Sequence, residues 1–142
     1  MTQHPILWLF LGLFGGLVFL TWARSSDPTG QRRVLAVGLL VAALIYGGFG
    51  ALGPGGPWLL LELSGVALFG LLAWLGWRHS VLWLAFGWGL HSLWDGLLHL
   101  HGAGAVYTPT WYVLACLSFD LLVAAWIVTQ RKALARSARE AS

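Results

Sequence analysis

Five long apolar runs constrain the fold of this chain more than any other feature of its sequence. They cover residues 5–23, 34–52, 58–77, 80–100 and 110–129, and short polar or glycine-rich segments separate them. A helix that crosses the hydrocarbon core of a bilayer needs about 20 mostly apolar residues, which each run supplies. With 142 residues, the chain has no room for a soluble domain beside them. We therefore predict one membrane domain over residues 1–142, an all-α polytopic bundle of five transmembrane helices.

The charge content indicates the same environment. Of all residues, 58% are hydrophobic and only 9% are charged, whereas soluble domains carry about a quarter charged residues. The lipid bilayer is therefore the expected solvent for most of the surface. Cys116 is the only cysteine, so an intrachain disulfide is excluded.

The basic residues set the predicted orientation. With five spans, residues 24–33, 78–79 and 130–142 lie on one side of the membrane, and they contain all eight Lys and Arg residues. Lys and Arg are retained on the cytoplasmic side, so we predict the N-terminus outside, the C-terminus inside and a cytoplasmic basic tail over residues 130–142. The segment before the first run has no Lys or Arg, unlike a signal peptide, so this run is expected to be a retained span. The basic side chains meet anionic lipid head groups, and no nucleic-acid partner is expected.

Five ionisable residues interrupt the apolar spans: Glu62, His91, Asp95, His99 and Asp120. An acid that faces lipid near the centre of a helix costs about 2.5–3.5 kcal/mol, so these side chains should point inward and satisfy one another. His91, Asp95 and His99 follow one another at four-residue intervals and share one helix face. Counting the helix rise from the outer boundary places Glu62 at the depth of Asp95, and Asp120 at the depth of His91. We predict that all five converge on one site that opens to the non-cytoplasmic side.

The side chains of this cluster are typical metal ligands. Histidine and carboxylate groups bind zinc, iron and manganese, so the predicted cofactor is a divalent metal ion, with zinc as one candidate. His91 and His99 lie about 12 Å apart along a helix, too far for one ion with bonds of about 2.0–2.2 Å. Two ligand sets that share one aspartate remain open: His91, Asp95 and Asp120, or Asp95, His99 and Glu62. Tyr46 on the second span and Cys116 on the fifth fall at a similar depth, and we expect them to support the site.

Three classes of function fit this site. The first is a metal-dependent hydrolase of a lipid or isoprenoid, in which the ion polarises the reacting bond or activates water and Glu62 or Asp120 is the catalytic general base. The second is a metal or proton carrier that uses the cluster as a midplane site, although no polar residue continues from His91 and Asp120 to the cytoplasmic side. The third is a structural membrane subunit in which the cluster is a buried polar network without a metal.

We also expect a homo-oligomer, because five short spans enclose little space for a lipid-like substrate. Gly12 and Gly16 lie in the first predicted span. They form a pair of small residues with the spacing that lets helices approach closely, and this pair marks the predicted interface.

Several local sequences of the chain match a known family. The matching positions lie between Gln31 and Trp126: Arg32–Arg33, Tyr46-Gly47-Gly48, Gly50, Glu62, the run Trp88-Gly89-Leu90-His91-Ser92-Leu93-Trp94-Asp95, His99, Pro109, Cys116 and Asp120. On these residues the chain resembles the small bacterial membrane proteins of the family catalogued as domain of unknown function 6010. The resemblance implies a multi-pass protein of the bacterial inner membrane and supports the same polar residues, but it implies no activity. The sequence His99-Leu100-His101 departs from the adjacent histidines expected of the family.

Overall fold

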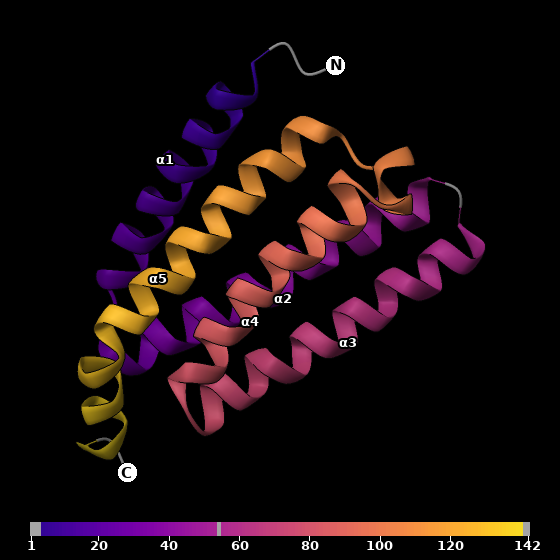
Figure 1. Cartoon of the computed structure of the whole chain (residues 1–142). Helices are drawn as coiled ribbons and strands as arrows, with labels where there is room; N and C mark the ends of the chain where they lie inside the picture. The colour runs from indigo at the N-terminus through magenta and orange to yellow at the C-terminus, as the bar shows by residue number, and fades with distance from the viewer. Residues whose placement is uncertain (1–3, 54, 141–142) are drawn as a thin grey trace.

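The computed structural model describes residues 4–53 and 55–140, which are helical almost throughout (Figure 1). Within these residues the elements follow in the order α1 (Pro5–Arg24), α2 (Pro28–Leu52), α3 (Gly56–Arg78), α4 (Val81–Trp94), the π-helix η1 (Asp95–Leu100), the 3-10 helix η2 (Ala103–Val106) and α5 (Thr110–Glu140). The described ranges contain no β-strand. The predicted all-α fold is therefore confirmed.

Residues that favour helix starts occur where the helices begin. The Asp27 carboxylate accepts a hydrogen bond from the Gly30 N–H at the start of α2. Ser80 accepts one from the Leu82 N–H at the start of α4. Both are preferred N-cap residues because a side-chain oxygen satisfies a free N–H of the first turn. Gly55 has a φ of 61° before α3, a conformation that costs glycine little. The breaks between the helices are thus encoded locally.

Successive helices run in opposite directions, so the bundle has two chemically different ends (Figure 1). The connections α1–α2 and α3–α4 lie at one end, together with Arg24, Arg33 and Arg78. We call this the basic end. The opposite end, with the α2–α3 connection and η2, is the loop end. α5 packs on both α1 and α4, while α2 packs on α3.

The surface of the bundle suits a membrane. α1, α2, α3 and the stretch Thr110–Ala135 of α5 are each long and apolar enough to cross a bilayer. The large apolar side chains of Phe10, Phe14, Leu60 and Leu97 are more than half exposed. Such a surface is costly in water, whereas hydrocarbon accommodates it. The chain is therefore a multi-pass helical membrane protein.

The fourth predicted span differs in form from the others. α4 has 14 residues, which is too short to cross a bilayer alone. The six-residue π-helix η1 continues it to Leu100, so the helical segment 81–100 still covers the predicted run. A π-helix forms i→i+5 hydrogen bonds, and short π segments occur frequently at functional sites. Within the described residues, four helices rather than five meet the criteria for a span on their own.

The interior divides into an apolar and a polar half. Toward the basic end, large apolar side chains form one cluster that includes Leu35, Leu39, Phe69, Leu84, Val123 and Ile127. At the edge of this cluster, the Trp88 indole N–H donates to the Leu35 carbonyl over 3.2 Å. The buried residues Glu62, His91, Asp95, His99 and Asp120 lie farther toward the loop end.

Arg32 has a structural role in addition to its predicted place among the basic residues that set the orientation. Its side chain is only 6% exposed, and Nη2 donates to the carbonyls of Gly76 (2.6 Å) and His79 (3.3 Å) at the end of α3. The last carbonyls of a helix lack donors within the helix, and the helix dipole favours a cation beside them. Arg32 therefore ties α2 to the C-terminus of α3.

The predicted oligomer interface is wrong, because Gly12 and Gly16 are buried inside the chain. A Cβ at Gly12 would overlap the carbonyl group of Ala115, and one at Gly16 would press on the Leu122 side chain. Small residues at these positions let α1 approach α5 closely. The pair thus serves packing within one copy, and homo-oligomer formation stays a prediction without an assigned interface.

α5 extends beyond the predicted end of the fifth span. It runs to Glu140, well past Thr129. Residues 130–140 are mostly Ala, Arg, Lys and Glu, which favour helix formation. The predicted basic tail is therefore helical over its described part, whereas residues 141–142 lie outside the described residues.

The predicted orientation places the C-terminus in the cytoplasm. A fluorescent protein that folds only in the cytoplasm should fluoresce when it is fused after Ser142, because the basic end carries the charges retained on that side. Alkaline phosphatase, which is active only after export, should be inactive there and active when inserted into the 101–109 connection. Phosphatase activity after Ser142 would contradict the orientation.

Candidate metal centre

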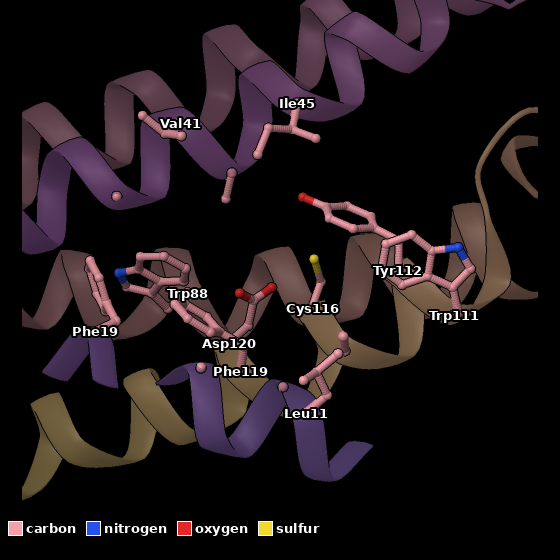
Figure 2. A pocket seen from close by; sticks show the side chains of 15 residues that line it. Leu11, Phe19, Val41, Ile45, Trp88, Trp111, Tyr112, Cys116, Phe119 and Asp120 are labelled. Atoms are coloured by element: carbon pink, nitrogen blue, oxygen red, sulfur yellow. The ribbon is translucent and has the colours of Figure 1, made fainter. Parts of the chain in front are cut away.

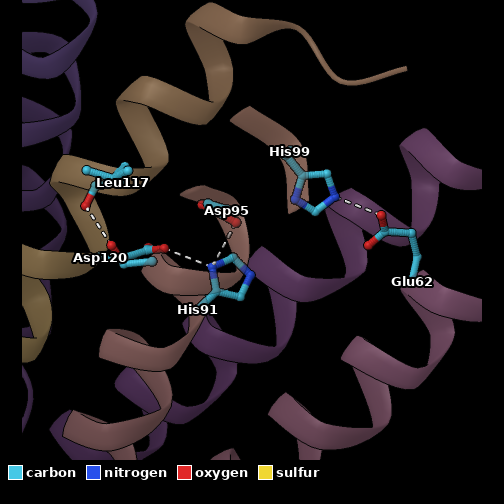
Figure 3. A network of polar contacts seen from close by, with 7 residues as sticks. Glu62, His91, Asp95, His99, Leu117 and Asp120 are labelled. Carbon is cyan, nitrogen blue, oxygen red and sulfur yellow. Dashed lines mark hydrogen bonds and ion pairs between the residues drawn. The ribbon is translucent and has the colours of Figure 1, made fainter. Parts of the chain in front are cut away.

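His91, Asp95 and Asp120 meet in the interior of the bundle (Figure 3). His91 Nδ1 lies 2.8 Å from Asp120 Oδ2 and 3.6 Å from Asp95 Oδ1. One ligand atom from each residue lies within 4.8 Å of the others, and each residue is at most 1% exposed. Two carboxyl groups and an imidazole are thus gathered in a buried group, which we call the His–Asp–Asp triad.

The helices explain why these side chains meet. His91 lies near the end of α4, and Asp95 is the first residue of η1. Because they are four residues apart on a continuous helical segment, they share one face. α5 packs along α4 and brings Asp120 to this face from the neighbouring helix (Figure 3).

Glu62 and His99 form a second buried pair. His99 Nε2 lies 2.7 Å from Glu62 Oε1, and the Tyr107 hydroxyl donates to the same oxygen. Tyr107 lies in the connection between η2 and α5. Burial raises the pKa of its hydroxyl, and the hydrogen bond to Glu62 acts in the same direction. The hydroxyl therefore stays protonated and remains a donor to Glu62. We call this group the Glu62–His99 pair.

Tyr46 lies between the two groups. Its ring stacks on His99, with ring centroids 4.1 Å apart and planes inclined by 25°. The same ring lies 5.6 Å from the imidazole of His91. Tyr46, Glu62 and His91 also line one narrow void between α2, α3 and α4. The triad and the pair are thus neighbours, separated by aromatic packing.

The structure divides the predicted single site into two groups. It brings together the ligand set His91, Asp95 and Asp120, and in the part of the chain that it describes no other three metal-binding side chains come as close. The alternative set is not assembled, because His99 and Glu62 pair with each other rather than with Asp95. The π-helix supplies the physical reason. Its wider turn rotates His99 away from the stripe that an α-helix would continue through His91 and Asp95.

Polar atoms without partners mark the space around these residues. Seven buried side-chain N and O atoms lack a hydrogen bond in the described part of the chain, and five of them belong to Tyr46, His91, Asp95 and His99. Both oxygens of Asp95 are among them, since His91 Nδ1 at 3.6 Å is too distant for a hydrogen bond. A buried polar group without a partner costs about 1–3 kcal/mol. A cation at the triad would satisfy Asp95, so the residues present fit a bound metal ion.

The sequence analysis did not predict the positions of three residues near the site. Tyr107 was missed, because it lies in a connection without helical periodicity and the spacing rules do not reach it. Cys116, expected to support the cluster, is partly exposed and lines an apolar groove beside Asp120. His101 is exposed, so it does not take the place of a second histidine beside His99.

Bundle and site together define a small multi-pass membrane protein with a buried His and carboxyl centre. The chain belongs to the family of unknown function DUF6010, whose family model matches residues 8–133. The resemblance found between residues 31 and 126 is therefore confirmed, and the match also covers most of α1. No curated protein and no solved structure matches the chain.

Proposed function

We propose that the protein is an intramembrane metal-dependent hydrolase whose divalent ion is held by His91, Asp95 and Asp120. The observation that supports this proposal is the triad itself. Its three ligand atoms lie within 4.8 Å of one another, and both oxygens of Asp95 are buried without a hydrogen bond. Metal–ligand bonds are about 2.0–2.2 Å long, so small side-chain rotations bring all three atoms to one ion.

Charge balance favours a divalent ion at this place. An ionised side chain inside a membrane is costly unless it is paired, and two carboxylates side by side repel each other. A divalent ion offsets the two negative charges, while the neutral imidazole completes the ligand set. Oxygen and imidazole ligands suit zinc, iron and manganese, and zinc is one candidate among these.

Three protein ligands also leave room for a reacting molecule. Catalytic zinc sites keep three protein ligands and an open position, whereas structural sites are closed by four. When bound, the ion supplies a polarised carbonyl or phosphoryl oxygen or an activated water. Glu62 lies outside the triad and lines the same narrow void as His91, so it is the better placed of the two expected bases, and Asp120 serves as a ligand. The proposed substrate is a lipid or isoprenoid, because the triad is buried in the membrane-spanning part of the chain.

The packing supports an enzyme better than a carrier. Transport across the membrane requires polar groups on both sides of the triad. Glu62, His99 and Tyr107 provide them toward the loop end. Toward the basic end, the apolar cluster around Leu39 and Phe69 fills the interior. This apolar barrier favours a site that is reached from one side only.

The proposal predicts about one divalent ion per chain in protein purified without chelators. Elemental analysis of the detergent-purified protein measures the content and identifies the element. Glu62→Gln is the matched control: the glutamine has the same shape, and Glu62 lies outside the triad, so this variant should retain the ion. Wild-type protein that holds no metal, even after incubation with zinc, iron(II) and manganese(II), would contradict the proposal and favour a structural polar network.

A further inference from the structure

An apolar groove runs along the side of the bundle between α1 and α2 (Figure 2). It has a volume of about 420 Å³, and α5 and Trp88 contribute to its floor. The groove forms because α1 packs mainly on α5 and contacts α2 little. Gly15 leaves space on the α1 side, because a Cβ there would meet only the Phe119 ring, at 3.7 Å. Ligand clefts measure about 300–1,000 Å³, so the groove is large enough for a small ligand.

The mouth of the groove faces lipid. Its rim residues Leu11, Val41 and Ile45 are 48%, 46% and 40% exposed. They belong to α1 and α2, both of which are long and apolar enough to cross a membrane. A mouth with apolar rims on such helices opens to the hydrocarbon of the bilayer rather than to water. A ligand of this groove therefore comes from the bilayer and presents a hydrocarbon chain to it.

One wall of the groove carries polar atoms. Tyr112, Cys116 and Asp120 follow at four-residue intervals on one face of α5, and all three line the groove. Figure 2 shows the Cys116 sulfur and the Asp120 carboxyl group pointing into it. Asp120 also lies 2.8 Å from His91 in the triad, so one carboxyl group borders both the groove and the candidate metal centre. The walls that a ligand meets are nonetheless almost entirely hydrocarbon, because Asp120 is only 1% exposed, so the groove fits the apolar chain of a ligand.

We propose that the groove binds one acyl chain of a membrane lipid, which enters sideways between α1 and α2 and lies along the face of α5 that carries Tyr112, Cys116 and Asp120. The volume, near the lower end of the range for ligand clefts, suits one chain. Acyl lipids surround the mouth at a higher concentration than any other hydrocarbon, and occupancy rises with concentration. Hydrolysis of the bound lipid rests on the proposed function, but binding of the chain requires no metal.

A fatty acid with a diazirine in its chain tests this groove directly. After irradiation of the detergent-purified full chain with this probe, mass spectrometry should locate the label on groove residues such as Val41 and Ile45. Gly15→Phe should abolish the labelling, because a Cβ there meets only the Phe119 ring, at 3.7 Å, and a phenyl group extends into the groove. Gly70→Phe is the matched control. Its Cβ meets only Leu40, at 3.6 Å, outside the groove, and labelling should be unchanged.

A second variant keeps the test decisive if Gly15→Phe fails to fold. Val41→Trp fills the mouth and should also abolish labelling, whereas Val37→Trp adds the same ring at a position 53% exposed and outside the groove. Labelling that persists in Val41→Trp, or that spreads evenly over the exposed residues of all helices, would overturn the groove as a binding site. Labelling by a prenyl alcohol probe without labelling by the fatty acid would overturn the acyl chain as its occupant.

Metal content measured on the same samples separates this inference from the proposed function. Selective labelling of protein that holds no metal supports the groove and contradicts the hydrolase. Metal retained without selective labelling overturns the groove and leaves the metal centre in place.

Discussion

Asp95→Asn is expected to abolish metal retention by the purified protein. Asp95 supplies one of the three ligand atoms, and neither of its oxygens accepts a hydrogen bond in the described part of the chain. Asparagine keeps the shape but replaces an oxygen by an NH₂ group, which donates hydrogen bonds and binds no cation. The triad also loses one of its two negative charges. Changes outside the ligands already cost about 10–100-fold in metal affinity, so loss of a ligand should cost more than about 100-fold. Elemental analysis and titration against a metal indicator measure the loss.

Variants of the neighbouring groups test whether the triad is the centre. Glu62→Gln and His99→Ala alter the Glu62–His99 pair and should retain the ion. Asp120→Asn should lose it, because this change removes the other negative charge beside His91. Stoichiometric metal in the Asp95→Asn protein would contradict the assignment. If Glu62→Gln and His99→Ala lose the metal while the two aspartate variants retain it, the metal would be assigned to the Glu62–His99 pair.

Much of the fold could be predicted because a membrane protein needs sequence features that are easy to recognise. Apolar runs of span length predict helices, since a backbone in hydrocarbon must satisfy its hydrogen bonds internally. The basic residues at alternate breaks, such as Arg24 and Arg78, require the alternating arrangement that Figure 1 shows. Ser80 marks the start of α4 by its capping chemistry, where the fourth span was predicted to begin. These features are local or follow from the solvent, so they need no knowledge of tertiary contacts. The cap Asp27 was not used in this way, and α2 begins at Pro28, within the segment 24–33 that was predicted to separate two spans.

The site could be predicted only in part. The cost of a polar group in lipid requires ionisable side chains to point inward, and Glu62, His91, Asp95, His99 and Asp120 are all buried. Which of these side chains meet depends on how each helix is rotated about its axis. The depth estimated from the helix rise gives no information about this rotation. The π-helix that begins at Asp95 turned His99 toward Glu62, so one predicted site became a triad and a pair.

Contacts between distant segments could not be predicted from the sequence. Tyr107 reaches Glu62 from a connection whose path depends on how η1 ends. Gly12 carries a spacing that is equally compatible with packing inside one copy or between copies, and only the position of α5 decides between them. The groove between α1 and α2 forms because these two helices diverge, and nothing in their sequences indicates the divergence.

In the absence of metal, Asp95→Leu is expected to be more stable than the wild type. Both oxygens of Asp95 are buried without a hydrogen-bond partner, and each such group costs about 1–3 kcal/mol of stability. Leucine has the same branched arrangement of heavy atoms at Cγ, so it fills the position without polar atoms. Because Asp95 accepts no hydrogen bond, its replacement by leucine leaves no donor without an acceptor. Thermal unfolding in detergent with a chelator, followed by circular dichroism, should show a higher midpoint for the variant.

Asp120→Leu is the matched control, because the same substitution should act in the opposite direction there. Asp120 has a partner in His91 at 2.8 Å, and its removal takes away the hydrogen bond of a buried imidazole, which lowers stability. Added metal should then stabilise only the wild type, by about 2.7 kcal/mol at a concentration of 100 times Kd. In a structural polar network, both acids would contribute to stability, and both leucine variants would unfold below the wild type in chelator. That outcome would contradict the assignment of Asp95 as a metal ligand. Opposite shifts of the unfolding midpoint in the two variants would support the assignment.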